Sequence, residues 1–155
     1  MTSFFDGTDL DALSLHVEAW LEAQADDNPI VAEVVRDTEH PRRWHVRVRG
    51  EEKDVYTIRF ELRQRTLHYE TYVMPAPEEN HAEFFAHLLR RNAGLYGAAF
   101  CVAEEDAVYL QGQVDNALVA AGTEDLDRVL GSMWVWVEQF FRPALRIGFA
   151  SRFKG

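Results

Sequence analysis

Hydrophobic and polar residues alternate most regularly within residues 55–92. Two stretches in this segment, 56–63 and 66–73, change character at every second position, and a short polar link at 64–65 joins them. Alternation with this period is typical of strands that bury one face, and so short a link predicts an antiparallel pair. In the second stretch both sets of positions contain large side chains, so the pattern leaves open which set is buried.

Three segments carry apolar residues three or four positions apart, which is the spacing of one helix face. The first is expected to begin near Leu10 with Thr8 as its N-cap, and to end before Pro29, since proline disfavours helix in the residue before it. The second is expected at 78–92, after two prolines that end the strand before it. Its predicted buried stripe consists of Phe84, Phe85, Leu88 and Leu89.

The third and longest helix is expected at 124–141, and Pro143 is expected to bend or restart it. Strand patterns flank the second helix on both sides. Besides the pair described above, strands are expected at 30–35, 44–49, 98–103 and 107–114. The order α-β-β-β-β-α-β-β-α predicts an α+β fold, in which an antiparallel sheet carries three helices packed on one face.

The chain is expected to form a single domain over residues 1–155, with 1–7 as a loose leader. With 155 residues, the chain is long enough to bury a core without disulfides or a structural metal. Hydrophobic residues make up 47% of it, which excludes an acidic disordered protein. The charges sum to 16 − 26 = −10. A negative balance opposes binding to nucleic acid and to anionic membranes. Without a signal-peptide pattern or a long apolar run, a cytoplasmic location is expected.

Residues of the usual catalytic and metal-binding types are present but lack the spacing that such sites need. Cys101 is the single cysteine and lies in an apolar run, where a buried small hydrophobe is expected. The six histidines show no zinc-site spacing, and the glycines match no phosphate-binding loop. The sequence therefore predicts no catalytic residue, no metal ligand and no cofactor.

One predicted sheet face carries alternating charges along neighbouring strands, among them Arg59, His68 and Glu70. The plainer interpretation is a solvent-exposed face, on which opposite charges across strands contribute roughly 0.2–1 kcal/mol per pair. A basic groove for an acidic peptide or ligand is a second interpretation. A third is a polar pocket formed by the same three residues with Arg91, which would suit a small-molecule sensor or an enzyme.

The last predicted helix holds more aromatic residues than one stripe can bury. At 100° per residue, Trp134 and Trp136 point about 200° apart, so at least one needs cover beyond the main core face. That cover comes either from the chain itself or from a dimer or client. We expect partner contacts from Trp20 and from Trp134 or Trp136. Arg90 and Arg91 are further candidates, with helix capping or salt bridges as their alternative roles.

The chain resembles the YbjN family of small bacterial domains, especially its actinobacterial members. The likeness covers nearly all of the chain from Leu10 onward and rests on the order and lengths of the elements and on local strings. Three strings carry it: TIRFELRQRTLHYETYVMPAPEENHAEFFAHLLRRN at 57–92, YGAAFCVAEEDAVYLQGQV at 96–114, and LDRVLGSMWVWVEQFFRPALRIGFAS at 126–151.

The resemblance implies a fold like that of the type III secretion chaperones of the CesT/Tir type. Such domains are often dimeric, and they bind extended protein segments or regulate through protein contacts. The family has no established catalytic residues, so the resemblance transfers none. It favours a non-enzymatic chaperone-like or regulatory domain that recognises protein segments through apolar patches and sheet edges. The expected partner is a protein client, a regulatory partner or a second copy of the chain.

Overall fold

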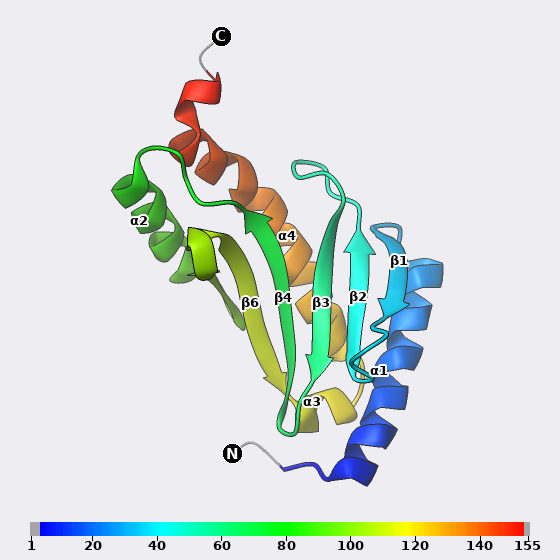
Figure 1. Ribbon diagram of the computed structural model, residues 1–155. Helices are drawn as coiled ribbons and strands as arrows, with labels where there is room; N and C mark the ends of the chain where they lie inside the picture. Colours follow the sequence, from blue (N-terminus) through cyan, green and yellow to red (C-terminus); the bar gives the residue numbers. More distant parts are fainter. Residues whose placement is uncertain (1–3, 154–155) are drawn as a thin grey trace.

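The computed structural model describes residues 4–153 of the chain. In this part, six strands form one antiparallel sheet in the spatial order β1-β2-β3-β4-β6-β5 (Figure 1). Strands β1 to β4 form a meander, whereas β5 lies outside β6 at the far edge. The bounds are β1 Val31–Arg36, β2 Arg43–Val48, β3 Tyr56–Leu62, β4 Thr66–Met74, β5 Ala98–Val102 and β6 Val108–Asp115.

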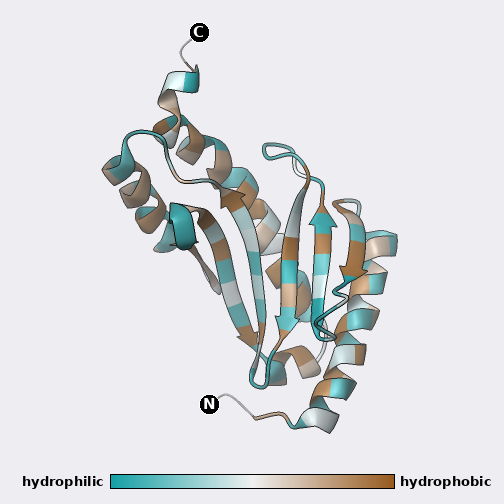
Figure 2. Ribbon diagram, in the orientation of Figure 1, coloured by the Kyte–Doolittle hydropathy of each residue, from teal (hydrophilic) through white to brown (hydrophobic). Residues whose placement is uncertain are grey.

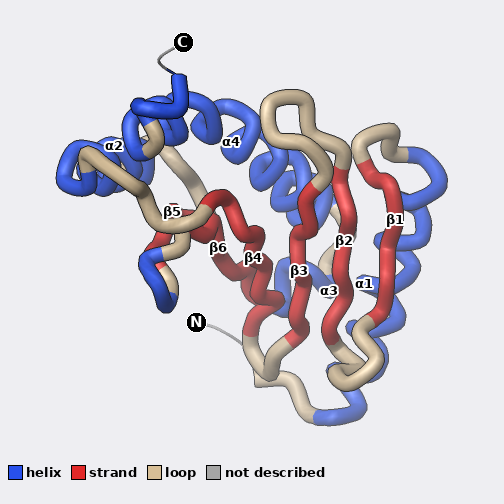
Figure 3. The backbone as a smooth tube through the Cα atoms, turned by 45° about the horizontal axis from the view of Figure 1, so that its top comes forward, coloured by secondary structure: helices blue, strands red, loops and turns tan. Residues whose placement is uncertain are grey.

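The helices leave one face of the sheet uncovered. Helix α1 packs on β1, α4 crosses β4 and β6, and the short α3 closes the lower end in Figure 1. Helix α2 lies beside β5 and against α4, at the end of the sheet opposite α1 (Figure 3). Their bounds are α1 Gly7–Asp27, α2 His81–Asn92, α3 Asn116–Ala120 and α4 Glu124–Gly148. The predicted α+β class, with an antiparallel sheet, is confirmed.

Strand register assigns each alternating position to a face. Trp44 pairs with Phe60, and Phe60 pairs with Tyr69, so all three lie on the helix-covered face and are buried. In β4 the buried set is the odd-numbered one, which settles the face that the sequence left open. The polar residues between these buried positions point to the other face, which gives the strands alternating hydropathy in Figure 2. The core therefore lies between the sheet and the layer of α1, α3 and α4.

The predicted N-cap of the first helix is wrong by two residues. Asp6 is the N-cap, and its carboxylate accepts the Asp9 backbone N–H at 2.8 Å. The Asp9 carboxylate in turn accepts the Asp6 backbone N–H at 3.1 Å. This reciprocal pair satisfies two backbone donors that the first turn leaves without helical partners, which Thr8 inside the helix cannot do. Such a capping box usually has Glu or Gln at the third helical position, and here Asp9 takes that place.

The expected loose leader, residues 1–7, falls partly outside the described residues, which begin at Phe4. The Phe5 backbone N–H donates to the Gln64 carbonyl at 3.1 Å, and the Phe5 side chain packs against the core. Gly7 already belongs to α1.

Helix α4 continues past the expected end at residue 141 and through Pro143 to Gly148. Proline lacks one backbone N–H, but packing compensates: Ala144 and Gly148 are buried. At Gly148 a Cβ would lie 2.6 Å from the Phe84 ring, so this end of α4 sits tightly on α2. The short helix α3 was not predicted. It begins at buried Asn116, whose side chain donates to the Arg63 carbonyl at 2.7 Å.

Candidate functional site

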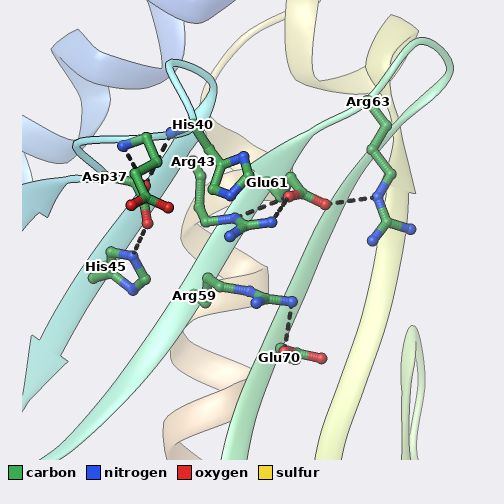
Figure 4. Close-up of polar contacts among 9 residues, drawn as sticks. Asp37, His40, Arg43, His45, Arg59, Glu61, Arg63 and Glu70 are labelled. Carbon is green, nitrogen blue, oxygen red and sulfur yellow. Dashed lines mark hydrogen bonds and ion pairs between the residues drawn. The ribbon is translucent and has the colours of Figure 1, made fainter.

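The polar residues predicted to form a pocket lie on the uncovered sheet face. Arg59 and Glu70 are directly opposite in the register of β3 and β4, and their side chains form an ion pair at 2.6 Å (Figure 4). His68 lies two residues before Glu70, opposite Glu61. Burial, and next the nearby Arg63 guanidinium, lower the pKa of His68. The three predicted residues are thus neighbours, but Arg59 and Glu70 neutralise each other.

Glu61 occupies the centre of a second group of charges on this face, between two guanidinium groups. The Arg43 Nε and the Arg63 Nε each lie 2.9 Å from a carboxylate oxygen of Glu61 (Figure 4). Burial would raise the pKa of Glu61, but the hydrogen bonds from Arg43 and Arg63 outweigh it and hold the pKa below its ordinary value. The basic groove suggested by the sequence is therefore occupied by the chain's own carboxylates.

A third pair lies at the β1 end of the same face. Asp37 follows β1 directly, and its Oδ2 hydrogen-bonds the His45 ring at 2.8 Å. Its other oxygen accepts the backbone N–H groups of Glu39 and His40, each at 2.9 Å. The hydrogen bond with His45, and then these backbone bonds, hold the pKa of Asp37 far below its ordinary value. Asp37 therefore organises the turn between β1 and β2.

The predicted partner contact Trp20 lies in the core. Its side chain is 5% exposed, and its ring meets Phe60 edge to face at a centroid distance of 5.9 Å. Its indole N–H donates to the Asp127 carboxylate at 2.8 Å. Trp20 thus offers almost no surface to a partner, because α1 turns this face toward the sheet and α4.

The two tryptophans of α4 are half-buried and pack against the core. The Trp134 indole N–H donates to the Arg49 backbone carbonyl at 2.8 Å, at the end of β2. Trp134 and Trp136 point in different directions from α4, and the chain itself therefore covers much of both side chains. Arg90 and Arg91 are exposed in the last turn of α2.

Next to these arginines lies an apolar surface that α2 and β5 form together. It surrounds a cavity of about 110 Å³. We call it the α2–β5 surface; its lining residues are Phe85, Leu88, Leu89, Phe100, Cys101 and Val102. Leu89 is 68% exposed and Val102 49% exposed, so the predicted buried stripe of α2 is wrong at Leu89. Burial raises the pKa of the Cys101 thiol, which keeps it protonated and apolar.

At the opposite edge of the sheet, α1 and β1 enclose a groove of about 420 Å³. Its residues were not identified from the sequence. One wall carries the acidic residues Glu18, Glu22 and Asp26 of α1, spaced four residues apart. We call this feature the α1–β1 groove; its lining residues are Glu18, Glu22, Ala25, Asp26, Val34, Arg36 and Trp44. The four-residue spacing was the signal available in the sequence.

Metal ligands and membrane-spanning helices also bear on the class of site. Within residues 4–153, no three His, Cys, Asp or Glu side chains gather where they could hold a metal ion. None of the helices described there combines the length and the apolar character needed to cross a membrane.

Comparison with known proteins identifies relatives of the chain. A family model described as "YbjN: Putative bacterial sensory transduction regulator" matches residues 14–145. Uncharacterized protein Rv0487 of Mycobacterium tuberculosis and Uncharacterized protein Mb0497 of Mycobacterium bovis are each 31% identical over 130 residues, which cover 80% of this chain and 70% of theirs. Uncharacterized protein ML2442 of Mycobacterium leprae is 33% identical over 88 residues, or 57% of this chain and 47% of its own.

Proposed function

The chain belongs to the YbjN family, and from that membership we propose that it is a non-enzymatic regulatory domain that binds a protein segment. The family's description as regulators of sensory transduction supports a role exercised through contacts with other molecules. The chaperone-like fold implied by the resemblance supports a segment, rather than a small molecule, as the bound partner.

The α2–β5 surface is the observation that carries this proposal. Single exposed apolar side chains are common on protein surfaces, but large ones that gather around a cavity often mark an interaction site. Leu89 and Val102 form such a rim, with Leu88 and Phe100 buried beneath it. Arg90 and Arg91 follow in the same helical turn, on a chain whose net charge is −10. The matching partner is a segment that inserts apolar side chains and carries acidic residues beside them.

The polar face of the sheet supports catalysis or small-molecule sensing less well. Arg59 and Glu70 are paired with each other, and Glu61 is held by two arginines. A small polar ligand would have to break these pairs before it could bind, which costs part of its own binding energy.

The test is crosslinking of the purified 155-residue chain in lysate of its host, followed by reconstitution with each purified candidate. Val102→Glu places a charge on the α2–β5 surface. Leu118→Glu is the matched control, because Leu118 is also 49% exposed but lies on α3. We expect a protein that binds the native chain and the control, with at least tenfold weaker binding to Val102→Glu.

Two outcomes would contradict the proposal. One is a set of captured proteins that is the same for the native chain and for Val102→Glu. The other is a dimer in sedimentation equilibrium that only Val102→Glu dissociates, which would assign the α2–β5 surface to a second copy of the chain.

A further inference from the structure

The wall that α1 contributes to the α1–β1 groove carries a row of carboxylates. Glu18, Glu22 and Asp26 are four residues apart, so they follow one another along one side of the helix, about 6 Å apart along its axis. Glu18 has an ion pair with Arg36 at 3.3 Å. Glu22 and Asp26 are exposed. The row therefore presents negative charge along the length of the groove.

The other wall is an edge strand. Within the described residues, β1 is hydrogen-bonded to β2 on one side and has no strand on the other. Alternate residues of an edge strand direct their backbone N–H and C=O groups away from the sheet, where another extended chain can pair with them. Val34 and Arg36 belong to this strand and line the groove. Helix α1 runs alongside β1 in the opposite direction (Figure 1).

Beneath both walls lies Trp44, which is 1% exposed. Its indole Nε1–H has no acceptor among the described residues, whereas the indoles of Trp20 and Trp134 both donate hydrogen bonds. A buried donor without an acceptor destabilises a fold, because it has given up its hydrogen bond to water and gained none in return. An acceptor brought by a bound molecule would remove that cost.

From these three features we infer that the α1–β1 groove binds an extended protein segment with Lys or Arg at alternate positions. Such a segment pairs its backbone with β1. Alternate side chains of a strand are about 6.6–6.8 Å apart, close to the spacing of the carboxylate row, so successive cations meet Glu22 and Asp26, while Glu18 keeps its ion pair with Arg36. A backbone carbonyl of the segment accepts the Trp44 indole N–H. Because that N–H is shielded in the free chain, side chains at the rim move as the segment enters.

The chemistry of the groove favours a peptide over a small polycation. A polyamine matches the carboxylates, but its ammonium groups are donors and offer nothing to the Trp44 N–H or to the N–H groups of β1. A peptide carries cations, carbonyl acceptors and amide donors together. The inference deepens the proposed function, on which it rests for a protein as partner, but it uses the opposite edge of the sheet from the α2–β5 surface.

The experiment titrates the ¹⁵N-labelled 155-residue chain with an acetylated decapeptide of alternating Lys and Thr. Trp44→Phe identifies the Trp44 indole cross-peak by its loss. We expect that cross-peak to shift on addition of the peptide, while those of Trp20 and Trp134 stay in place. A peptide with Glu in place of Lys, and spermidine, are expected to leave the Trp44 cross-peak unchanged.

A pair of charge reversals on neighbouring residues separates specific from general attraction. Asp26→Lys changes a groove residue, and Asp27→Lys makes the same change in net charge one position away, outside the lining. We expect Asp26→Lys to weaken peptide binding at least fivefold relative to Asp27→Lys, measured by fluorescence anisotropy. Equal weakening in both variants, an unmoved Trp44 cross-peak, or the same shift with spermidine would overturn the inference.

Binding of the Lys-Thr peptide to the α1–β1 groove can be tested independently of the proposed function. Val102→Glu leaves the α1–β1 groove intact, so it should bind the peptide like the native chain. Loss of partner binding in Val102→Glu together with no peptide binding in any chain would leave the proposed function standing and remove the inference.

Discussion

The side chain of Asn92 hydrogen-bonds both backbone groups of Phe100. Its Oδ1 accepts the Phe100 N–H at 2.7 Å, and its Nδ2 donates to the Phe100 carbonyl at 3.0 Å. Phe100 lies in β5, the edge strand beyond β6, so the amide of Asn92 stands where the backbone of a neighbouring strand would be. The last residue of α2 thus closes the middle of an edge that would otherwise attract other strands.

Replacing Asn92 with Ala should open this edge. Two backbone groups lose their partners, and we expect a loss of about 1–3 kcal/mol in the free energy of unfolding, measured by urea denaturation. The exposed edge should also make the variant self-associate as its concentration rises, which sedimentation velocity would detect. Arg91→Ala, at an exposed neighbouring position, is the control and should change neither property. An Asn92→Ala chain with native stability and a single monomer peak would show that the Asn92–Phe100 bonds contribute nothing.

The Glu138 carboxylate of α4 holds the loop between β2 and β3, and an ion pair between Arg142 and Glu52 also joins this loop to α4. Glu138 Oε2 accepts backbone N–H groups from Glu51, Glu52 and Lys53, at 3.1, 2.5 and 3.3 Å. Gly50 begins this loop, and a Cβ there would lie 1.7 Å from the Lys53 carbonyl oxygen and 2.3 Å from Glu138 Oε1. The loop therefore closes around Glu138 only with glycine at this position.

We expect Gly50→Ala to pull the loop off α4 and to cost about 2–3 kcal/mol of unfolding free energy, the upper part of the usual range for destabilising mutations. Gly131→Ala is the matched control, since a Cβ at Gly131 meets nothing within 4 Å and Ala is the better helix former. Amide hydrogen exchange at 51–53 should rise in Gly50→Ala alone. Native exchange rates there would contradict the role assigned to Gly50.

Lys53 in the same loop has an unusual environment for a cation. Its ammonium donates to the Tyr72 and Val73 carbonyls, at 2.5 and 2.8 Å, and lies 5.1 Å from the centre of the Tyr72 ring. Burial lowers the pKa of Lys53 to about 8, although the charge of Glu138 acts in the opposite direction. In the unfolded chain the ordinary pKa is 10.5.

Because its pKa is lower in the folded state, Lys53 makes stability rise with pH. Between about pH 8 and 10.5 the unfolded chain binds the proton that the folded chain has lost, so the free energy of unfolding increases across this window. Below pH 8 both states are protonated and this contribution is flat. Lys53→Met should remove this rise while all other groups titrate as before. The difference in unfolding free energy between the native chain and Lys53→Met, plotted against pH, therefore isolates the contribution of Lys53. A constant difference from pH 7 to 10 would rule out the lowered pKa.

The alternation of polar and apolar residues sufficed to predict the sheet, since a period of two assigns faces wherever one face is buried. It could not predict that β5 is the far edge strand, because β6 inserts between β4 and β5 and this spatial order is not the chain order. The closing of β5 by Asn92 depends on that order. The α1–β1 groove depends instead on how α1 packs beside β1, which strand alternation does not contain, although the spacing of its carboxylates was visible.

Helical periodicity identified which residues are apolar on a helix but not what lies against them. Leu89 belongs to the apolar stripe of α2, yet it is exposed because α2 lies at the end of the sheet and not over it. Trp20 was expected to be a partner contact, yet it is buried because α1 and α4 meet at this residue. In both cases the deciding contact is with a distant element, which local spacing does not contain.

The bond from the Trp20 indole to Asp127 joins α1 and α4, which are 107 residues apart at this point. Asp127 lies in the first turn of α4, where a carboxylate also complements the helix dipole. The bond is charge-assisted, but its acceptor is exposed to solvent, which reduces its strength. We therefore expect the pair to be coupled by about 1 kcal/mol, within the range for hydrogen bonds in proteins.

A double-mutant cycle measures this coupling. Trp20→Phe keeps an aromatic ring against Phe60 but removes the N–H, and Asp127→Asn keeps the size of the acceptor but removes its charge. Each single variant should lower the free energy of unfolding, and the double variant should lose less than the sum of the two. Asp125→Asn, in the same turn but bonded to Arg128, is the control and should be additive with Trp20→Phe. Additivity in both cycles would mean that Trp20 stabilises the fold through packing alone and that its indole N–H does not hold α1 to α4.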